Sequence, residues 1–191
     1  MINVFIFHGT GGSPAGNWFP WLKGKLEKKE CLVFVPQFPD PRENHNLEDW
    51  LKVLQKYEQH IDERSILVGH SLGGLFLLRV LERLNHPVAA AFFVATPVGV
   101  KPIRYYDSDE KFSGFKFEWG KIKGNANNFF VYHSNNDPYV SLGNGELLAK
   151  QLGVQLTMVP NAGHLNAESG HTKFDRLLKD INGILGKQQD L

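Results

Sequence analysis

Cysteine and long apolar runs are scarce in this chain. Its 191 residues include one cysteine, Cys31, so no disulfide can form within the chain and no cysteine pair is present for a structural zinc site. Because Cys31 lies in the apolar run 31–35, we expect a buried structural thiol. No run approaches the roughly 18 apolar residues of a membrane span, and strand-like residues follow Met1 without a basic leader. We therefore expect a cytoplasmic, soluble protein that does not bind membranes.

Charge of one sign is equally scarce. The chain has 21 Lys and Arg residues against 20 Asp and Glu residues, for a formal net charge of +1. Binding to nucleic acid or to an anionic membrane needs a strongly basic surface, so we expect neither as a partner. The length fits a single domain, residues 1–191, which is long enough to bury a substantial core.

A complete phosphate-binding motif is missing as well, although a glycine-rich loop is present. The loop His8-Gly9-Thr10-Gly11-Gly12 follows the apolar segment 2–7. Counted from Gly9, the dinucleotide fingerprint needs its last glycine where Pro14 stands, and no Lys-Ser or Lys-Thr pair follows as a P-loop requires. We predict no metal and no organic cofactor. The loop resembles a backbone cradle for an anionic group.

The chain does contain a regular alternation of predicted strands and helices. The predicted strands are apolar on both faces, as in buried parallel sheets, and span residues 2–7, 31–35, 66–68, 88–94, 129–133 and 154–159. The predicted helices span residues 17–29, 47–61, 72–84, 145–152 and 172–185. This alternation predicts an α/β fold with a doubly wound, mostly parallel six-stranded sheet and helices on both faces. A proline-rich loop is expected at 36–46 and a frayed tail at 186–191.

One interval breaks this alternation. Residues 96–128 contain no clear strand, but they hold six aromatic side chains scattered among Asp, Lys and Gly. One interpretation is a small cap over a cleft. The other, of equal weight, is an ordinary helix and connection packed on the sheet.

The segment Gly69-His70-Ser71-Leu72-Gly73 joins the predicted strand 66–68 directly to the next helix. Its G-x-S-x-G pattern is that of a nucleophile elbow, in which the turn strains the serine backbone and the glycines let neighbouring chain pass close. Ser71 is therefore the candidate nucleophile. A glycine-rich strand end is also often only a tight turn, so this interpretation depends on finding a base and an acid elsewhere.

Candidates for the acid and the base follow the last two predicted strands. Asp137 stands after strand 129–133, and His164 stands in a glycine-containing loop after strand 154–159. The order Ser, Asp, His is the one that this type of elbow requires, and ligand sites of open α/β sheets lie at the carboxyl ends of strands. We therefore predict a catalytic triad of Ser71, Asp137 and His164.

Other positions are weaker candidates. The other place for an acid, after strand 88–94, reads Ala95-Thr-Pro-Val-Gly99 and offers no carboxylate. Among the other histidines, His8 is expected to shape its loop, His70 to support the elbow, His133 to be packed at a strand end and His171 to lie at the surface.

The predicted oxyanion hole uses backbone donors. One is the N–H of Leu72, at the start of the helix after the elbow, where the helix dipole also favours negative charge. The other comes from the first loop, at Thr10 or Gly11. Three aromatic residues are candidates for contacts with the acyl group: Trp18, Phe19 and Trp119.

These motifs resemble those of the α/β-hydrolase superfamily, and within it the compact serine hydrolases similar to retinoblastoma-binding protein nine and its bacterial relatives. The matching segments span nearly the whole chain: His8-Gly9, Asn17-Trp-Phe-Pro-Trp-Leu22, Glu48-Asp-Trp50, Gly69-His-Ser-Leu-Gly73, Asn136-Asp-Pro138 with Val140, and Ala162-Gly-His164. The retinoblastoma-binding pattern L-x-C-x-E is missing, because Lys29 precedes Cys31 and Val33 follows it. Binding to retinoblastoma-type pocket proteins is therefore not expected.

The resemblance implies a compact hydrolase fold with the same triad and a small-molecule acyl substrate. From the residues we expect hydrolysis of a small carboxylic ester, thioester or amide through an acyl-enzyme. Two alternatives stay open. One is a catalytically weak binding or regulatory protein that retains the fold, and the other is a transferase to an acceptor other than water.

Overall fold

The computed structural model describes residues 1–39 and 44–189. Its six strands form one sheet in the order β2-β1-β3-β4-β5-β6, and every neighbouring pair is parallel. Their bounds are β1 Asn3–Phe7, β2 Leu32–Phe34, β3 Ile66–His70, β4 Ala90–Val94, β5 Phe129–His133 and β6 Leu156–Met158. The predicted doubly wound six-stranded sheet is confirmed.

The central strands are apolar because both of their faces are covered. On β1, Phe5 and Phe7 face one apolar layer, whereas Val4 and Ile6 face the other, and all four are fully buried. Alternate side chains of a strand point to opposite faces, so each layer receives every second residue. Two separate cores result, one on each side of the sheet.

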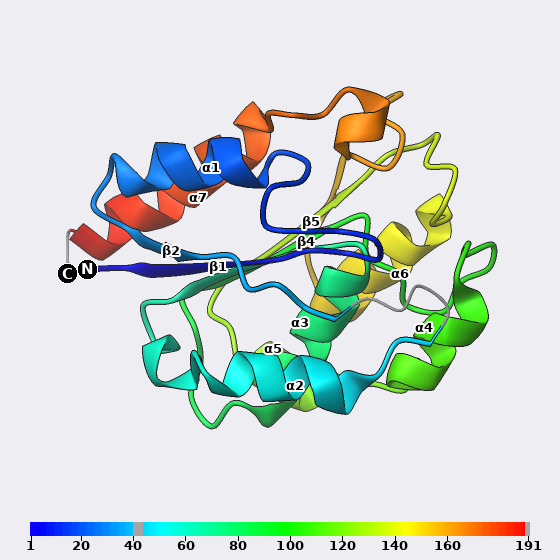
Figure 1. Cartoon of the computed structure of the whole chain (residues 1–191), viewed down its shortest axis with the longest axis horizontal. Helices are drawn as coiled ribbons and strands as arrows, with labels where there is room; N and C mark the ends of the chain where they lie inside the picture. Colours follow the sequence, from blue (N-terminus) through cyan, green and yellow to red (C-terminus); the bar gives the residue numbers. More distant parts are fainter. Residues whose placement is uncertain (40–43, 190–191) are drawn as a thin grey trace.

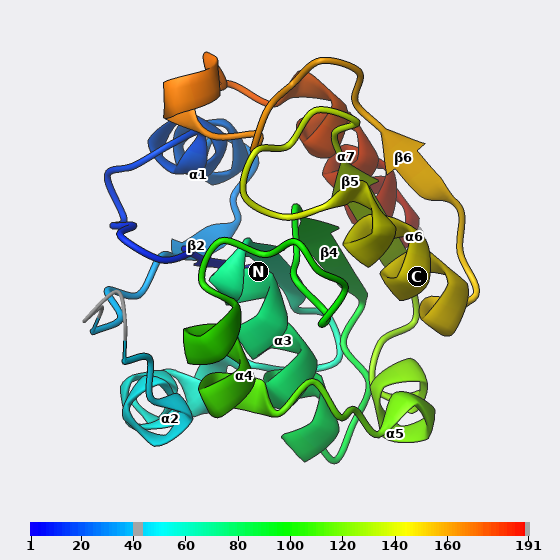
Figure 2. The same ribbon diagram turned by 90° about the vertical axis from the view of Figure 1, so that its right-hand side faces the viewer.

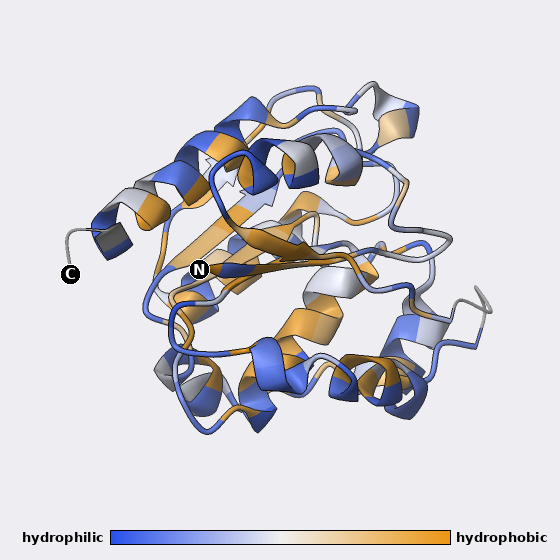
Figure 3. Cartoon of the chain, turned by 60° about the vertical axis from the view of Figure 1, so that its left-hand side comes forward, coloured by the Kyte–Doolittle hydropathy of each residue, from blue (hydrophilic) through white to orange (hydrophobic). Residues whose placement is uncertain are grey.

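Helices complete both layers (Figure 1). The helices α1 Phe19–Glu27 and α7 Asp175–Gln189 cover the face of the sheet on which Val4 and Ile6 lie. The other face carries α2 Leu47–Gln55, α3 Leu72–Arg83, α4 Tyr106–Ser113, α5 Trp119–Gly124 and α6 Leu142–Leu152. Figure 3 shows the apolar residues gathered on the sheet and on the helix faces turned toward it.

Several predicted boundaries shift. The helix predicted at 47–61 ends at Gln55, and a short 3₁₀ turn at Glu58–His60 leads back toward β3. The last helix begins at Asp175 and continues to Gln189, so the prediction of a frayed tail is wrong up to that residue. Residues 190–191 lie outside the described residues, as do residues 40–43 of the predicted proline-rich loop. Apolar spacing marks the buried face of a helix better than it marks the helix ends.

The interval 96–128 contains α4 and α5 and packs beside α3. Phe112 and Ile122 are buried in the core, and Arg79 of α3 donates hydrogen bonds to the carbonyls of Ser113 and Lys116. This arrangement fits the interpretation of an ordinary connection packed on the fold. The stretch before α4 also contributes residues to the cavity described below. A role as a cap stays a prediction.

The parallel strands all end at the same edge of the sheet. The loops that follow β1, β3, β4, β5 and β6 gather there, as the view in Figure 2 shows. This edge is where the predicted site residues should meet. Within residues 1–39 and 44–189, no helix is both long enough and apolar enough to cross a membrane.

Candidate active site

Ser71 stands in the turn between β3 and α3 with a strained backbone, at φ 55° and ψ −124°. Its N–H donates to the carbonyl of Val94 at 2.8 Å, and its own carbonyl accepts from the N–H of Gly74 at 2.9 Å. A Cβ at Gly73 would collide with the backbone carbonyls of Phe7 and His8, so only glycine fits there. The predicted elbow geometry is therefore present, and the neighbouring strands hold it in place.

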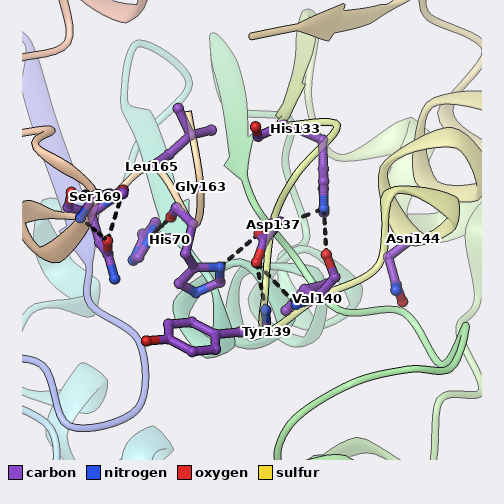
Figure 4. A network of polar contacts seen from close by, with 12 residues as sticks. His70, His133, Asp137, Tyr139, Val140, Asn144, Gly163, Leu165 and Ser169 are labelled. Carbon is purple, nitrogen blue, oxygen red and sulfur yellow. Dashed lines mark hydrogen bonds and ion pairs between the residues drawn. The ribbon is translucent and has the colours of Figure 1, made fainter. Parts of the chain in front are cut away.

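Asp137 and His164 come together as predicted. The His164 ring nitrogen Nδ1 lies 2.7 Å from Asp137 Oδ2. The other carboxylate oxygen, Oδ1, accepts the backbone N–H groups of Tyr139 at 2.8 Å and Val140 at 3.1 Å. Burial alone would raise the pKa of Asp137, but these hydrogen bonds and the adjacent His164 outweigh it and hold the pKa below its ordinary value. An ionised carboxylate therefore faces the imidazole. Figure 4 shows Asp137 beside Tyr139 and Val140, whose N–H groups it accepts.

A cavity of about 430 Å³ brings Ser71 and His164 to a common surface. The loop after β1 forms one wall of the cavity and includes the lining residue Thr10. This loop passes close to Ser71, because a Cβ at Gly9 would lie 2.7 Å from the Ser71 Cβ. Ser71 Oγ forms no hydrogen bond with the His164 ring in the structure. Such contacts are often long in unliganded hydrolases and shorten when substrate binds.

Of the two predicted oxyanion donors, Thr10 lines this cavity and Leu72 follows the lining residue Ser71 in the chain. Leu72 is also the first residue of α3. The dipole of α3 places partial positive charge at this point. The roles of Leu72 and Thr10 as donors stay predictions.

The loop that carries His164, residues 159–166, is the histidine loop. Side chains, rather than regular secondary structure, hold it in place. Three side-chain oxygens of the β5–α6 loop accept consecutive backbone N–H groups at 2.7 to 2.9 Å. Asn135 Oδ1 accepts from Asn161, Ser134 Oγ accepts from Ala162, and Asn136 Oδ1 accepts from Gly163. Two carbonyls of the loop accept from the opposite side, His164 from His70 Nε2 at 2.9 Å and Leu165 from Trp18 Nε1 at 3.0 Å. These bonds fix the backbone of the loop and so position the imidazole that it carries.

His70 contacts the loop that carries His164, and its support of the elbow stays a prediction. The ring is buried, and its Nε2 reaches the carbonyl of His164, 94 positions away in the chain. Burial, with a smaller contribution from the neighbouring His164, lowers the pKa of His70 to about 3. The ring is therefore neutral near neutral pH, and its single proton lies on Nε2, where it is donated to the carbonyl.

The three aromatic residues predicted to contact the acyl group lie elsewhere. Trp18 and Phe19 are fully buried in the layer of α1 and α7, and Trp119, the first residue of α5, packs against the opposite core. None of the three lines the cavity. Trp18 bonds the carbonyl of Leu165 instead, which makes it a support for the histidine loop. Their positions outside the cavity argue against a role in substrate contact.

A second group of serine, histidine and aspartate occurs close to the cavity. Ser108 and Asp109 of α4 lie against His45, a residue of the segment before α2, and all three are buried. Ser108 Oγ lies 2.9 Å from His45 Nδ1, and Asp109 Oδ1 lies 3.5 Å from the same nitrogen. The residue types are those of a triad, and sequence reasoning missed the group because its members lie outside the strand ends.

The geometry of this second group differs from that of a working triad. In a triad the carboxylate and the hydroxyl use opposite nitrogens of the imidazole, whereas here both meet Nδ1. Ser108 Oγ also accepts the backbone N–H of His45 at 3.1 Å, and neither Ser108 nor His45 lines the cavity. Burial raises the pKa of Asp109, although His45 opposes the shift. We conclude that the group ties α4 to the segment before α2.

His133 and His8 lie where the sequence predicts, whereas His171, expected at the surface, is half-buried ahead of α7. His133 is buried, donates from Nε2 to the carbonyl of Val140 at 2.9 Å and lies 3.7 Å from Asp137 Oδ2, and burial lowers its pKa. His8 accepts the N–H of Phe38 at 3.0 Å and so shapes its loop. Over residues 1–39 and 44–189, no three His, Cys, Asp or Glu side chains are placed to hold a metal ion.

Two further positioning residues escaped the sequence analysis. Asn144 of α6 is buried; its Oδ1 accepts the N–H groups of Val98 and Val100 at 2.8 and 3.0 Å, and its Nδ2 donates to the carbonyl of Val100 at 2.7 Å. Ser134, also buried, links the β5–α6 loop to the histidine loop. The only sequence signal for such roles is a polar residue in an apolar context beside a predicted strand end.

This fold, with a serine at the elbow after β3 and a carboxylate–imidazole pair beyond β5 and β6, is that of a compact α/β hydrolase. The chain belongs to the serine hydrolase family, whose model matches residues 4–182. The resemblance inferred from the motifs is thereby confirmed.

Individual relatives match over nearly the full length. The chain is 31% identical to YdeN of Bacillus subtilis strain 168 over 185 residues, which cover 97% of each protein. It is 28% identical to the serine hydrolase RBBP9 of Rattus norvegicus over 191 residues, with 94% of each protein covered. The crystal structure of the B. subtilis ydeN gene product matches with a TM-score of 0.89 at 28% identity, over 97% of this chain and 100% of that one.

A more distant structure shares the fold alone. Est1E from Butyrivibrio proteoclasticus with ferulic acid bound matches with a TM-score of 0.75 at 13% identity, over 100% of this chain and 90% of that one.

Proposed function

We propose that the chain, residues 1–191 acting as one catalytic domain, is a hydrolase of small carboxylic esters, thioesters or amides with Ser71 as nucleophile. The observation that carries the proposal is the 2.7 Å contact between His164 Nδ1 and Asp137 Oδ2 at the cavity that Ser71 also lines. A serine hydroxyl is a poor nucleophile near neutral pH unless a base accepts its proton. His164 is the base that the arrangement favours.

The proposed reaction has two halves. In the first, Ser71 Oγ attacks the substrate carbonyl carbon while His164 Nε2 takes the hydroxyl proton, and the same proton then passes to the leaving group as its bond to carbon breaks. In the second, His164 takes a proton from water and the resulting hydroxide attacks the acyl carbon. As the bond from that carbon to Ser71 Oγ breaks, the proton returns to Oγ and the carboxylic acid leaves. Asp137 keeps Nδ1 protonated, stabilises the imidazolium and remains ionised throughout.

The negative charge that develops on the carbonyl oxygen needs donors that are already in place. We assign this role to the backbone N–H groups of Leu72 and Thr10. Donors of this kind are effective because their orientation costs no rearrangement at the moment of reaction. Since both are backbone groups, the side chain at position 10 is not essential.

The experiment that tests the proposal uses a fluorophosphonate probe and a panel of short and medium p-nitrophenyl esters. We expect wild-type protein to be labelled once per chain and to hydrolyse part of the panel, and Ser71→Ala to do neither. Circular dichroism of both proteins controls for folding. A folded wild-type protein that takes no label and hydrolyses no ester would favour the binding-protein alternative. Adding alcohol or amine acceptors tests the transferase alternative, because transfer products would then appear.

A further inference from the structure

Three formally charged side chains line the cavity besides its histidines: Arg104, Asp109 and Glu168. Two of them already interact with other groups. Glu168 Oε2 accepts the hydroxyl of Tyr139 at 2.6 Å, and Asp109 Oδ1 lies 3.5 Å from the ring of His45. Arg104 is different. Whereas Arg79 and Arg176 pair with Glu82 and Asp180, Arg104 forms no ion pair with any carboxylate of residues 1–39 and 44–189.

Aromatic rings hold the Arg104 guanidinium. Its central carbon lies 4.7 Å from the centroid of the Tyr139 ring and 5.5 Å from that of Tyr105. The backbone is held as well, because the N–H of Arg104 donates to the carbonyl of Tyr139 at 2.8 Å and Ile103 pairs with Val140. The Arg104 side chain also contacts the Tyr139 hydroxyl, and the other N–H donors of the guanidinium can still meet a planar anion. The side chain is thus partly ordered and still able to bind.

This guanidinium lies close to the reacting groups. The Tyr139 ring packs edge-on against the His164 ring, with centroids 5.1 Å apart, so a single ring separates Arg104 from the proposed base. Tyr139 also belongs to the loop whose N–H groups bind Asp137. A group bound at Arg104 would therefore be held at a defined position relative to the carbonyl attacked by Ser71.

We propose that Arg104 is an anion-binding subsite that selects substrates carrying a carboxylate in addition to the ester or related acyl group. The inference rests on the proposed function, whose substrate class it narrows. An arginine fork suits a carboxylate because two N–H donors can meet two oxygens at once. A cationic substrate is the opposing possibility, since Asp109 and Glu168 share the lining. Glu168 is engaged with Tyr139, however, and burial disfavours the charged form of Asp109.

The carboxylate could stand on either side of the scissile bond, so the test has two arms. In the acyl arm, p-nitrophenyl hydrogen glutarate is compared with the neutral p-nitrophenyl ester of glutaramic acid. In the leaving-group arm, the butyrate ester of 3-hydroxybenzoate is compared with that of 3-hydroxybenzamide. In at least one arm we expect wild-type kcat/KM to favour the anionic member by about tenfold or more. Comparison of the two arms then shows whether the acyl group or the leaving group carries the carboxylate.

Substitutions at position 104 test whether the guanidinium charge causes the preference for anionic substrates. Arg104→Met removes the charge at similar length, and we expect the anionic-to-neutral ratio to fall to about one, whereas Arg104→Lys should keep part of the preference. The matched control is Lys101→Met, because Lys101 is also an exposed cation held over an aromatic ring, 3.9 Å from the centroid of Tyr106, but lies outside the cavity lining. This control should keep the wild-type ratio.

A binding measurement separates this inference from the proposed function. Monomethyl glutarate and dimethyl glutarate are titrated calorimetrically into Ser71→Ala protein, with and without Arg104→Met. Tighter binding of the monoester that disappears with Arg104→Met supports the subsite even if no ester is hydrolysed. If wild type hydrolyses esters but the ratio is unchanged in Arg104→Met, the proposed function stands and the subsite is refuted. Faster hydrolysis of a cationic glycine ester than of both anionic substrates also refutes the subsite.

Discussion

The chain contains two groups of serine, histidine and aspartate, and they differ in almost everything except composition. Ser71, Asp137 and His164 stand in three loops at one edge of the sheet, and the hydroxyl and the imidazole face a cavity. The group at Ser108 lies between a helix and a loop, buried, with hydroxyl and carboxylate against one nitrogen. The comparison teaches that proximity of the right residue types does not make a nucleophile. We propose Ser71 rather than Ser108 as the nucleophile because Ser71 lines the cavity and because the carboxylate contact of His164 uses Nδ1 alone.

The largest expected difference is between Ser71→Ala and Ser108→Ala. We expect Ser71→Ala to lose fluorophosphonate labelling and to lower kcat by roughly a thousandfold or more, because the attacking oxygen is gone. Ser108→Ala should keep labelling and lose about 1–2 kcal/mol of unfolding free energy, because two buried hydrogen bonds disappear. Intact-mass spectrometry and urea unfolding measure the two effects. Probe attached to a peptide containing Ser108 would reverse the assignment.

The two carboxylates offer the next contrast. In Asp137→Asn the imidazole loses its ionised partner, and we expect kcat to fall by about a thousandfold to ten-thousandfold with little change in KM. In Asp109→Asn we expect less than a tenfold change. Steady-state kinetics on one neutral ester compares the two variants. Equal losses in both would mean that the Ser108 group takes part in the reaction.

A smaller effect is expected where His70 supports the His164 loop. His70→Phe keeps a planar ring but removes the donor to the His164 carbonyl, so we expect kcat to fall by about tenfold with KM nearly unchanged. His70→Asn retains a donor and should recover part of the loss. His86→Phe, at a partly buried histidine near the start of β4, is the control. A fall in the thermal midpoint without any change in kcat would assign His70 to stability alone.

The smallest effect is one of stability against pH, with opposite signs at the two carboxylates. The pKa of Asp137 is lowered by folding, so its contribution is present above the unfolded pKa and is lost as pH falls through the folded value. The pKa of Asp109 is raised, so its ionisation destabilises the fold as pH rises through the acid range. As pH rises from 3 to 7, the unfolding free energy of wild type should therefore increase relative to that of Asp137→Asn. Over the same range it should decrease relative to that of Asp109→Asn.

Urea unfolding at several pH values measures both trends. Each is limited to about 1.4 kcal/mol per pH unit, the slope of a single titrating group. Parallel curves for wild type and Asp109→Asn would mean that burial does not shift this carboxylate.

The sheet and the acid–base pair could be predicted because both follow from local patterns. Apolar runs mark buried parallel strands, and β5 has the predicted bounds. Asp137 and His164 were found because they directly follow strands whose ends share one edge. These inferences need only the order of elements along the chain.

The supporting contacts could not be predicted in the same way. The bond from His70 to the His164 carbonyl joins residues 94 positions apart, and the bond from Trp18 to Leu165 joins residues 147 apart. Nothing in the local sequence of a histidine or tryptophan specifies a distant carbonyl as its partner. The same limit applies to Trp18, because the sequence around an aromatic residue near a predicted cleft is the same whether its side chain faces the cavity or the core.

The separation of the three site segments along the chain has a consequence for synthesis on the ribosome. The elbow lies between β3 and α3, but its partners follow β5 and β6, and the bonds that hold the base reach back to Trp18 and His70. At about 5–20 residues per second, the elbow leaves the ribosome several seconds before the base can join it. A nascent chain stalled before residue 160 would contain Ser71 without the proposed base His164, so a fluorophosphonate probe should leave such chains unlabelled.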